Sequence, residues 1–325
     1  MFSKYKKKIL LSAAIGALIF LGFSIYADFD NLVSALVRFN WYYFPIILTL
    51  SFGNYIFRFF KWEYYRKLIG IDVSPKLSFL IFLSSFVMSV TPGKLGEILK
   101  SYLIKEETGT PVSKSAPIIL AERLTDFISM ILLCLVGAFV FDYGKEIIIL
   151  IGICFLGFTI MLSSRKASFF IISLFEKISF LKKRIHHFHN AYESVYQMIR
   201  LKPLLSALTL SIIGWFMECF GFYIVLNEFS VDVEHSVTVL TATFIYGFAT
   251  LVGAIAMLPG GLGLTEASLT GLLQLLKIPK NISVASTIII RLATLWFGVF
   301  IGIVSVYFYQ RYSNKNISEL NVNKV

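Results

Sequence analysis

The sequence predicts an all-α polytopic membrane protein, with about six full spans and two re-entrant, Pro-Gly-broken helical hairpins that form an inverted-topology repeat. Three observations lead to this prediction: an apolar composition, long uncharged runs, and a Pro-Gly signature that occurs twice. Hydrophobic residues make up 57% of the 325 residues, and charged residues only 15%. A water-soluble domain of this length could not bury so much apolar surface.

Six apolar runs are long enough to cross a bilayer as single helices, because about 20 residues span the hydrocarbon core. They cover residues 9–27, 41–60, 115–141, 146–163, 203–229 and 281–309. The first run follows a lysine-rich start, as in a secretory signal, but it is long for a signal and ends at a poor cleavage site. We therefore expect it to be retained as the first span.

Two further apolar regions, residues 77–104 and 236–277, are each broken by the repeated signature. The first copy reads Thr91-Pro92-Gly93-Lys94-Leu95-Gly96-Glu97, and the second reads Leu258-Pro259-Gly260-Gly261-Leu262-Gly263-Leu264-Thr265-Glu266. At about 1.5 Å per residue, the arms beside the first break are too short to span about 30 Å, so a re-entrant hairpin is expected. In the second region, residues 236–257 alone are long enough to cross, and the hairpin there is inferred from the parity of spans and from charge.

The distribution of cations predicts the orientation in the membrane. Six spans put both termini on one side, and the main cation clusters then face the cytoplasm, as the positive-inside rule requires. One of these clusters follows the second run and contains Lys61, Arg66, Lys67 and Lys76. The first hairpin would enter from the cytoplasm and the second from the opposite face, so the two breaks, at Gly93 and Gly260, should approach each other near the midplane. The expected organisation, in a plasma (cell) membrane, is a first half (residues 1–163), a cytoplasmic connector (164–202), a second half (203–312) and a polar cytoplasmic tail (313–325).

The connector combines dense cations with apolar residues at spacings of 3 and 4. This pattern is typical of an amphipathic helix or a helical pair. A helix lying on the cytoplasmic leaflet is the favoured interpretation. A coiled-coil seam, which would make a homodimer, is the alternative.

The two breaks form the candidate binding region. A Pro-Gly break frees backbone amides and carbonyls, which a membrane tolerates only beside protein or a water-filled cavity. With Pro92 and Pro259 as hinges, the nearby glycines would let a headgroup or a helix approach the backbone closely. These glycines are Gly93, Gly96, Gly260, Gly261 and Gly263. Glycine hinges that serve only tight helix packing are the alternative.

Ionisable residues near the breaks are candidate headgroup ligands, because charges at membrane depth usually face a polar pathway. They are Lys94, Glu97, Glu122, Arg123, Asp126, Glu266 and Arg291, with Glu218 as a weaker candidate. Arg291 has no acid in its own run, so Glu266 or a bound phosphate is its expected partner. An internal Arg–Glu clamp that only braces the hairpins is the alternative.

The net charge of +11 does not indicate nucleic acid, because most cations lie in a few clusters between apolar runs. That arrangement reflects topology and attraction to anionic lipid headgroups. The sequence has no Walker A loop, no Ser-His-Asp pattern and no zinc-ligand spacing. No catalytic residue, cofactor or metal is therefore expected, and the chain is not expected to be an enzyme.

The motifs, in their order along the chain, resemble the lysylphosphatidylglycerol synthase transmembrane-region family. They are Thr91-Pro92-Gly93-x-x-Gly96-Glu97, Glu122-Arg123-x-x-Asp126, Pro259-Gly260-Gly261-Leu262-Gly263-x-x-Glu266 and the late Arg291. This flippase-like family includes the membrane half of the bacterial multiple peptide resistance factor. The resemblance implies a multi-pass fold with re-entrant helices that binds or moves polar lipids. It does not extend to the synthase domain, so synthesis of a lysyl-lipid by this chain is not expected.

Motifs and resemblance together predict a lipid flippase-like protein whose central polar cavity binds a polar or anionic lipid, of the phospholipid or polyprenyl-phosphate type. The alternative is a membrane subunit that presents its lipid to a separate aminoacyl- or glycosyl-transferase. The expected partners are membrane lipids with anionic headgroups, and a transferase subunit and a homodimer are left open.

Overall fold

The computed structural model describes residues 14, 16–90, 97–138, 145–163, 165, 185–229 and 237–313. Every regular element in these ranges is helical, which confirms the predicted class. After a first helix, Gly16–Tyr26, the α-helices are α2 (Phe29–Arg38), α3 (Phe44–Leu68), α4 (Pro75–Ser84), α5 (Leu99–Thr108), α6 (Val112–Ala138), α7 (Lys145–Ser163), α10 (Ile185–Met198), α11 (Leu201–Asn227), α12 (Val239–Ile255), α13 (Leu264–Leu275), α14 (Lys280–Arg291) and α15 (Phe297–Ser313). Short helical turns are η1 (Trp41–Tyr43), η2 (Ser85–Met88), η5 (Pro259–Gly261) and η6 (Leu292–Trp296).

Within the described residues, two helices are long and apolar enough to cross a membrane: α11, and the continuous helix Lys280–Ser313 formed by α14, η6 and α15. The helix Gly16–Tyr26 and α2 meet at 100° and together would make a third. The 25-residue α3 and the 27-residue α6 are long enough but carry several charges. Many of those charges pair inside the protein, which leaves the other sides of both helices free to face lipid. The count of six spans stays a prediction.

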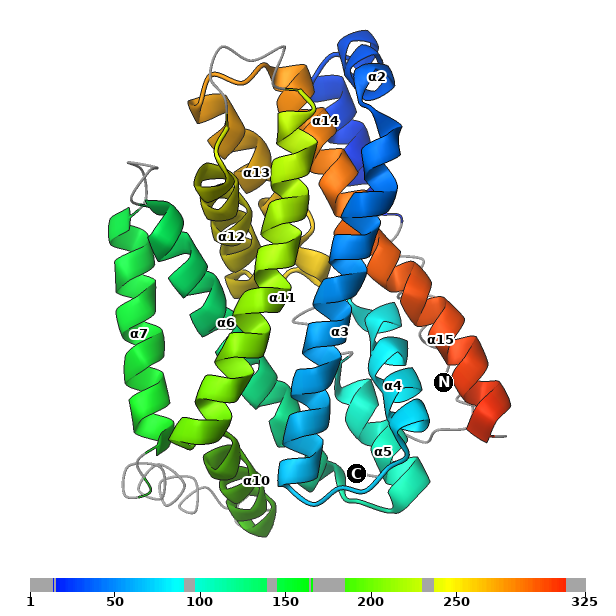
Figure 1. Ribbon diagram of the computed structural model, residues 1–325, viewed down its shortest axis with the longest axis vertical. Helices are drawn as coiled ribbons and strands as arrows, with labels where there is room; N and C mark the ends of the chain where they lie inside the picture. The colour runs from blue at the N-terminus through cyan, green and yellow to red at the C-terminus, as the bar shows by residue number, and fades with distance from the viewer. Residues whose placement is uncertain are drawn as a thin grey trace.

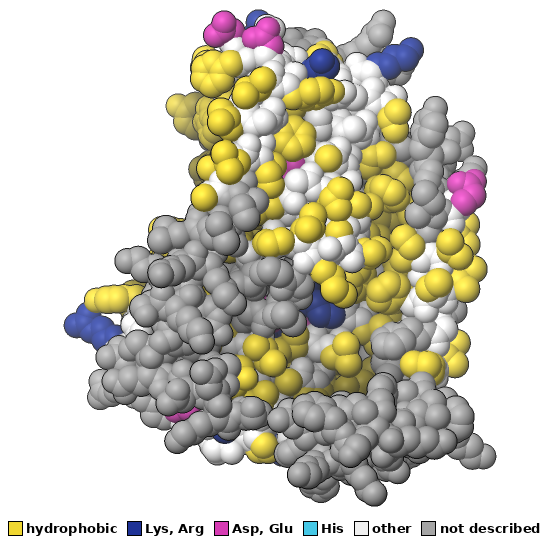
Figure 2. All heavy atoms as spheres, turned by 180° about the vertical axis from the view of Figure 1, so that it is seen from behind, with side chains coloured by type: hydrophobic (Ala, Val, Ile, Leu, Met, Phe, Trp, Pro, Cys, Tyr) yellow, Lys and Arg dark blue, Asp and Glu magenta, His cyan; other side chains and the backbone are white. Residues whose placement is uncertain are grey.

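The helices form an elongated bundle (Figure 1). Helices α3 and α11 pack together along its long axis, α12 packs on α6, and α4 packs on α15. Helices α2 and α13 lie toward one end of the bundle, and α5 and α10 toward the other. Hydrophobic side chains cover much of the described surface in the view from behind (Figure 2), where charged side chains are few and lie mostly along the edges, with one group of lysine or arginine atoms near the middle.

Two hydrophobic cores surround the two broken helices. The first contains Phe222, Ile245, Leu269 and Ile289, from α11, α12, α13 and α14. The second contains Trp62, Phe82, Leu103 and Val306, from α3, α4, α5 and α15. Each core therefore buries the helices beside one break.

The two breaks approach each other between these cores. Residues 91–96, which hold most of the first signature, lie outside the described residues. Val90 directly precedes them, and its Cγ1 would lie 3.6 Å from a Cβ built on Gly260 of the second signature. The predicted proximity of the breaks is therefore supported as far as Val90.

The last helix contains a π-helical turn, η6, between α14 and α15. A π turn holds one residue more than a regular turn. The Tyr55 hydroxyl donates a hydrogen bond of 2.7 Å to the Thr294 carbonyl oxygen within it. About two turns further on, Gly302 lies so close to η2 that a Cβ there would overlap the backbone of Val87.

Candidate functional site

The second break has a backbone that only its glycines adopt easily. After α12 ends, Gly260, Gly261 and Gly263 have φ angles of 61°, 67° and 89°, in the left-handed region that favours glycine. Space is also short, because a Cβ on Gly261 would lie 2.5 Å from Thr265 Oγ1. Met257, with φ 54°, is in the same region without being glycine. A non-glycine residue held there is strained, and such strain often lies at functional sites.

Arg291 and Glu266 form an ion pair, and Glu266 is one of the two partners that the sequence left open for Arg291. Arg291 Nε donates to Glu266 Oε1 at 2.6 Å, and Arg291 Nη2 donates to the Gly260 carbonyl oxygen at 2.7 Å. Glu266 Oε2 accepts from the Gly263 backbone N–H at 2.7 Å, which caps α13. These bonds connect the break to both α13 and α14.

Glu97 and Arg123 are also brought together, although they lie on separate elements. Arg123 Nη2, on α6, donates to Glu97 Oε1 at 2.8 Å. The same oxygen lies 3.9 Å from Arg58 Nη2, on α3. The Arg58 guanidinium also lies 5.4 Å from the ring centroid of Phe86 and 5.9 Å from that of Trp215. Cation–π attraction thus contributes to its position.

The two other acids of α6 make separate buried ion pairs. Asp126 Oδ1 lies 2.5 Å from Lys61 Nζ, and Glu122 Oε2 lies 2.5 Å from Lys100 Nζ. Lys61 was expected among the cytoplasmic cations, but its side chain is buried against Asp126 and Ser211. Neither Glu122 nor Asp126 lines the cavity described next. They hold α3, α5, α6 and α11 together instead.

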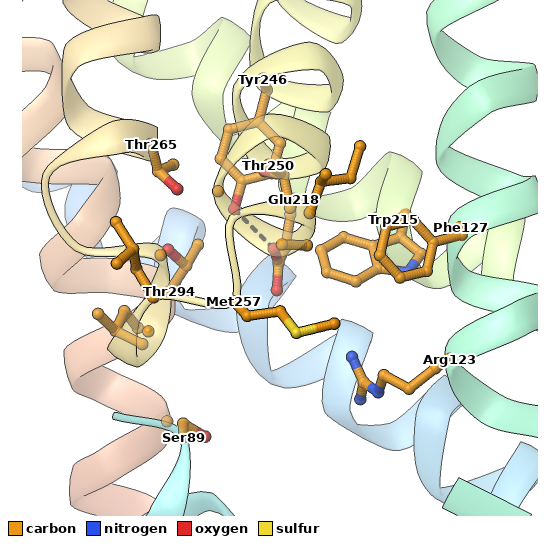
Figure 3. Close-up of a pocket in the computed structure, with 18 of the residues that line it drawn as sticks. Ser89, Arg123, Phe127, Trp215, Glu218, Tyr246, Thr250, Met257, Thr265 and Thr294 are labelled. Atoms are coloured by element: carbon orange, nitrogen blue, oxygen red, sulfur yellow. Dashed lines mark hydrogen bonds between the residues drawn. The ribbon is translucent and has the colours of Figure 1, made fainter. Parts of the chain in front are cut away.

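A cavity of about 650 Å³ lies between the two cores. Its charged lining residues, within the described part of the chain, are Arg58, Glu97, Arg123, Glu218 and Arg291. Aromatic and hydroxyl side chains line the cavity beside these charges, namely Tyr55, Phe86, Ser89, Phe127, Trp215, Tyr246, Thr250, Thr265 and Thr294. The Tyr246 hydroxyl donates to Glu218 Oε2 at 2.6 Å (Figure 3). Three arginines against two glutamates favour an anionic occupant.

One wall of this cavity is apolar and reaches the surface of the protein. It consists of Leu150, Ile151, Cys154 and Phe155 on α7, with Ile255, Met257 and Leu258 at the end of α12. Leu150 is 63% exposed and Met257 is 70% exposed. Figure 3 shows the Met257 side chain lying between Glu218 and Arg123. The polar interior is therefore separated from the outside by exposed hydrophobic side chains.

The structure brings together part of the predicted site. Gly260, Gly261, Glu97, Arg123 and Arg291 line the cavity, whereas Pro92, Gly93, Lys94 and Gly96 lie outside the described residues. The connector coincides in part with α10, whose Val195 packs beside Leu124 of α6.

Sequence reasoning missed Arg58, Trp215 and Tyr246. The signal for Arg58 is its place inside the apolar run 41–60, where a lone cation is costly. Trp215 and Tyr246 give no such signal, because apolar segments often contain aromatic residues.

These features define an α-helical integral membrane protein with two broken helices and a cavity lined by arginines, carboxylates and aromatic rings. Residues 9–302 match the family described as "Lysylphosphatidylglycerol synthase TM region". The chain belongs to that family, as its motifs predicted.

Several archaeal proteins are similar to this chain over most of its length. A UPF0104 membrane protein of Methanocaldococcus jannaschii is 29% identical over 231 residues, which cover 70% of this chain and 95% of that protein. A UPF0104 membrane protein of Methanothermobacter thermautotrophicus is 23% identical over 330 residues, covering 94% of each chain. A UPF0104 membrane protein of Pyrococcus horikoshii is 22% identical over 271 residues, covering 74% of this chain and 79% of the relative.

Proposed function

We propose that this protein binds a polar or anionic membrane lipid in its central cavity and moves the headgroup between leaflets. The proposal rests on one observation: the same cavity has a polar interior lined by arginines and an apolar wall that reaches the protein surface. A phospholipid or polyprenyl phosphate has the same division, with a charged headgroup and long apolar chains. The headgroup would lie beside Arg58 and Arg123, while the chains extend past Met257 into the bilayer.

The two broken helices provide the path for the headgroup in this proposal. In our view each is a re-entrant hairpin, the α4–α5 region entering from the cytoplasm and α12–α13 from the opposite face, with both termini cytoplasmic. The close approach of Val90 and Gly260 supports this arrangement, because the breaks then meet near mid-depth. Freed backbone groups at such a meeting point are tolerated when they line a polar cavity.

Arg123 provides the first test. Purified protein in liposomes should move a fluorescent anionic phospholipid between leaflets, and Arg123→Ala should reduce the rate at least about tenfold, because a charge-assisted hydrogen bond is worth about 1.5–3 kcal/mol. Arg311→Ala is the matched control, because Arg311 is an exposed cation at the end of α15. Equal rates for the two variants would refute the role of Arg123. Movement by the chain alone would also separate a translocator from a subunit that only presents lipid to a transferase.

The apolar wall provides a second test. Met257→Trp should slow lipid movement, because a larger side chain would narrow the route for the acyl chains. Ile303→Trp is the control, since Ile303 is 48% exposed on α15 and lies outside the cavity lining. If both tryptophan variants move lipid at the wild-type rate, the chains do not pass Met257.

A further inference from the structure

The two Glu–Arg pairs, similar in sequence, have different surroundings. Glu266 is fully buried, and its two oxygens accept hydrogen bonds from Arg291 Nε and the Gly263 N–H. Arg291 uses a second nitrogen to hold the Gly260 carbonyl. Because removing any partner would leave a buried polar group unsatisfied, this pair is a structural brace.

The Glu97 pair is arranged around the cavity instead. Glu97 Oε1 is approached by two guanidinium groups, from Arg123 at 2.8 Å and from Arg58 at 3.9 Å. The side chains of Arg123 and Arg58 are 20% and 14% exposed, against 9% for Arg291. Arg123 Nε is buried and has no hydrogen-bond partner among the residues that the structure describes. The two arginines therefore converge on a single carboxylate oxygen and retain unused donor capacity.

We propose that Arg58 and Arg123 form an anion site that Glu97 occupies as a displaceable internal counter-ion, and that a phosphate group of the ligand takes the place of its carboxylate. A phosphate offers three or four oxygens, so it can accept bidentate bonds from both guanidinium groups, whereas the shared Oε1 cannot. Arg58 is positioned in part by Phe86 and Trp215, so its place does not depend on Glu97 alone. This inference rests on the proposed function and deepens it by naming the phosphate and the residues that bind it.

The need to displace the Glu97 carboxylate also makes the site selective for anionic over neutral headgroups. A neutral headgroup cannot replace the carboxylate, because Arg58 would lose its nearest carboxylate at membrane depth, and Arg123 would be left with Asp126, 3.6 Å away, as its nearest one. Glu97 lies two residues before α5, so its release from Arg123 would remove one contact between this part of the chain and α6, while the pair of Lys100 and Glu122 would remain.

The test is equilibrium binding to the full-length protein in detergent, with three separate probes: fluorescent phosphatidic acid, fluorescent diacylglycerol, which is neutral and has no phosphate, and inorganic phosphate. Glu97→Gln should bind phosphatidic acid about tenfold more tightly than wild type, because a competitor that makes a charge-assisted bond is removed. Glu97→Asp, with a shorter reach, should tighten binding by a smaller factor. Glu266→Gln should lower the melting temperature without tightening binding.

Each probe has a defined meaning. Tighter binding of inorganic phosphate as well as phosphatidic acid would assign the site to phosphate in general, and tightening for phosphatidic acid alone would assign it to a lipid headgroup. Weaker or unchanged binding of phosphatidic acid by both Glu97 variants would overturn the displacement idea, as would equal tightening for diacylglycerol. If Glu97→Gln binds more tightly but wild type moves no lipid in liposomes, the anion site stands and the translocation proposal fails.

Discussion

Replacement of Lys61 by methionine tests whether the buried ion pairs of α6 hold the bundle together. Lys61 Nζ lies 2.5 Å from Asp126 Oδ1 and 2.6 Å from Ser211 Oγ, with longer bonds of 3.3 Å to Thr125 Oγ1 and 3.4 Å to the Glu122 carbonyl oxygen. Its side chain is 1% exposed. Lys61→Met therefore leaves the Asp126 carboxylate buried without its nearest cation.

The expected loss of stability depends on the contacts that Asp126 keeps in the Lys61→Met variant. Removing one partner of a buried pair costs about 3–5 kcal/mol. Asp126 would keep hydrogen bonds from Ser211 at 3.2 Å and Trp215 Nε1 at 3.1 Å, and Arg123 lies 3.6 Å away. We therefore expect a loss at the low end of this range, about 3 kcal/mol in the free energy of unfolding. This loss corresponds to a fall of roughly 6–12 °C in melting temperature.

The assay is thermal unfolding of the purified protein in detergent, followed by tryptophan fluorescence. Lys67→Met is the matched control, because Lys67 is an exposed lysine on the same helix. The double variant Lys61→Met with Asp126→Asn should lose about 2 kcal/mol less than the sum of the single losses, since the two residues interact directly. A Lys61→Met protein that melts within 1 °C of the Lys67→Met protein, at about the wild-type temperature, would refute this reasoning.

Three further predictions concern stability and are checked by the same unfolding measurement. Gly302→Ala should lower the free energy of unfolding by about 1–3 kcal/mol, because the added methyl group overpacks against η2. Gly157→Ala is the control and should be neutral or slightly stabilising, because a Cβ there meets open space. Equal effects of the two variants would contradict the packing argument. Met257→Gly should stabilise by about 1 kcal/mol, because it relieves a left-handed backbone at an exposed side chain, and a lower melting temperature would show that the Met257 side chain has a packing role. Tyr246→Phe should cost about 1.5–3 kcal/mol by removing the bond to Glu218, and an unchanged melting temperature would mean that this bond adds no net stability.

The sequence predicts well those features that local chemistry alone determines. A Pro-Gly break in apolar sequence interrupts a helix in almost any surroundings, and the short turn η5 at Pro259–Gly261 does separate α12 from α13. The Arg291–Glu266 pair was also predictable, because an arginine without an acid in its own run needs a partner at membrane depth.

Partners that depend on helix packing were not predictable. Periodicity shows that Glu122 and Asp126 share a face of α6, but it does not show that Lys100 and Lys61 lie opposite them. For the same reason Lys61 was expected in a cytoplasmic cluster, although the side chain turns inward. Arg58 was missed because its role depends on Phe86, Trp215 and Glu97, which come from three separate parts of the chain.

The π turn at Leu292–Trp296 sets the rotational phase between the two parts of the last helix. On the α14 side, Arg291 must face Glu266, and on the α15 side, Gly302 must face the backbone of η2. A regular helix turns by about 100° for each residue, so one residue fewer between them would rotate α15 by that angle relative to α14. Gly302 would then turn away and a larger side chain would meet η2. The single extra residue therefore allows one continuous helix to pack into both cores, with α14 in the first core and α15 in the second.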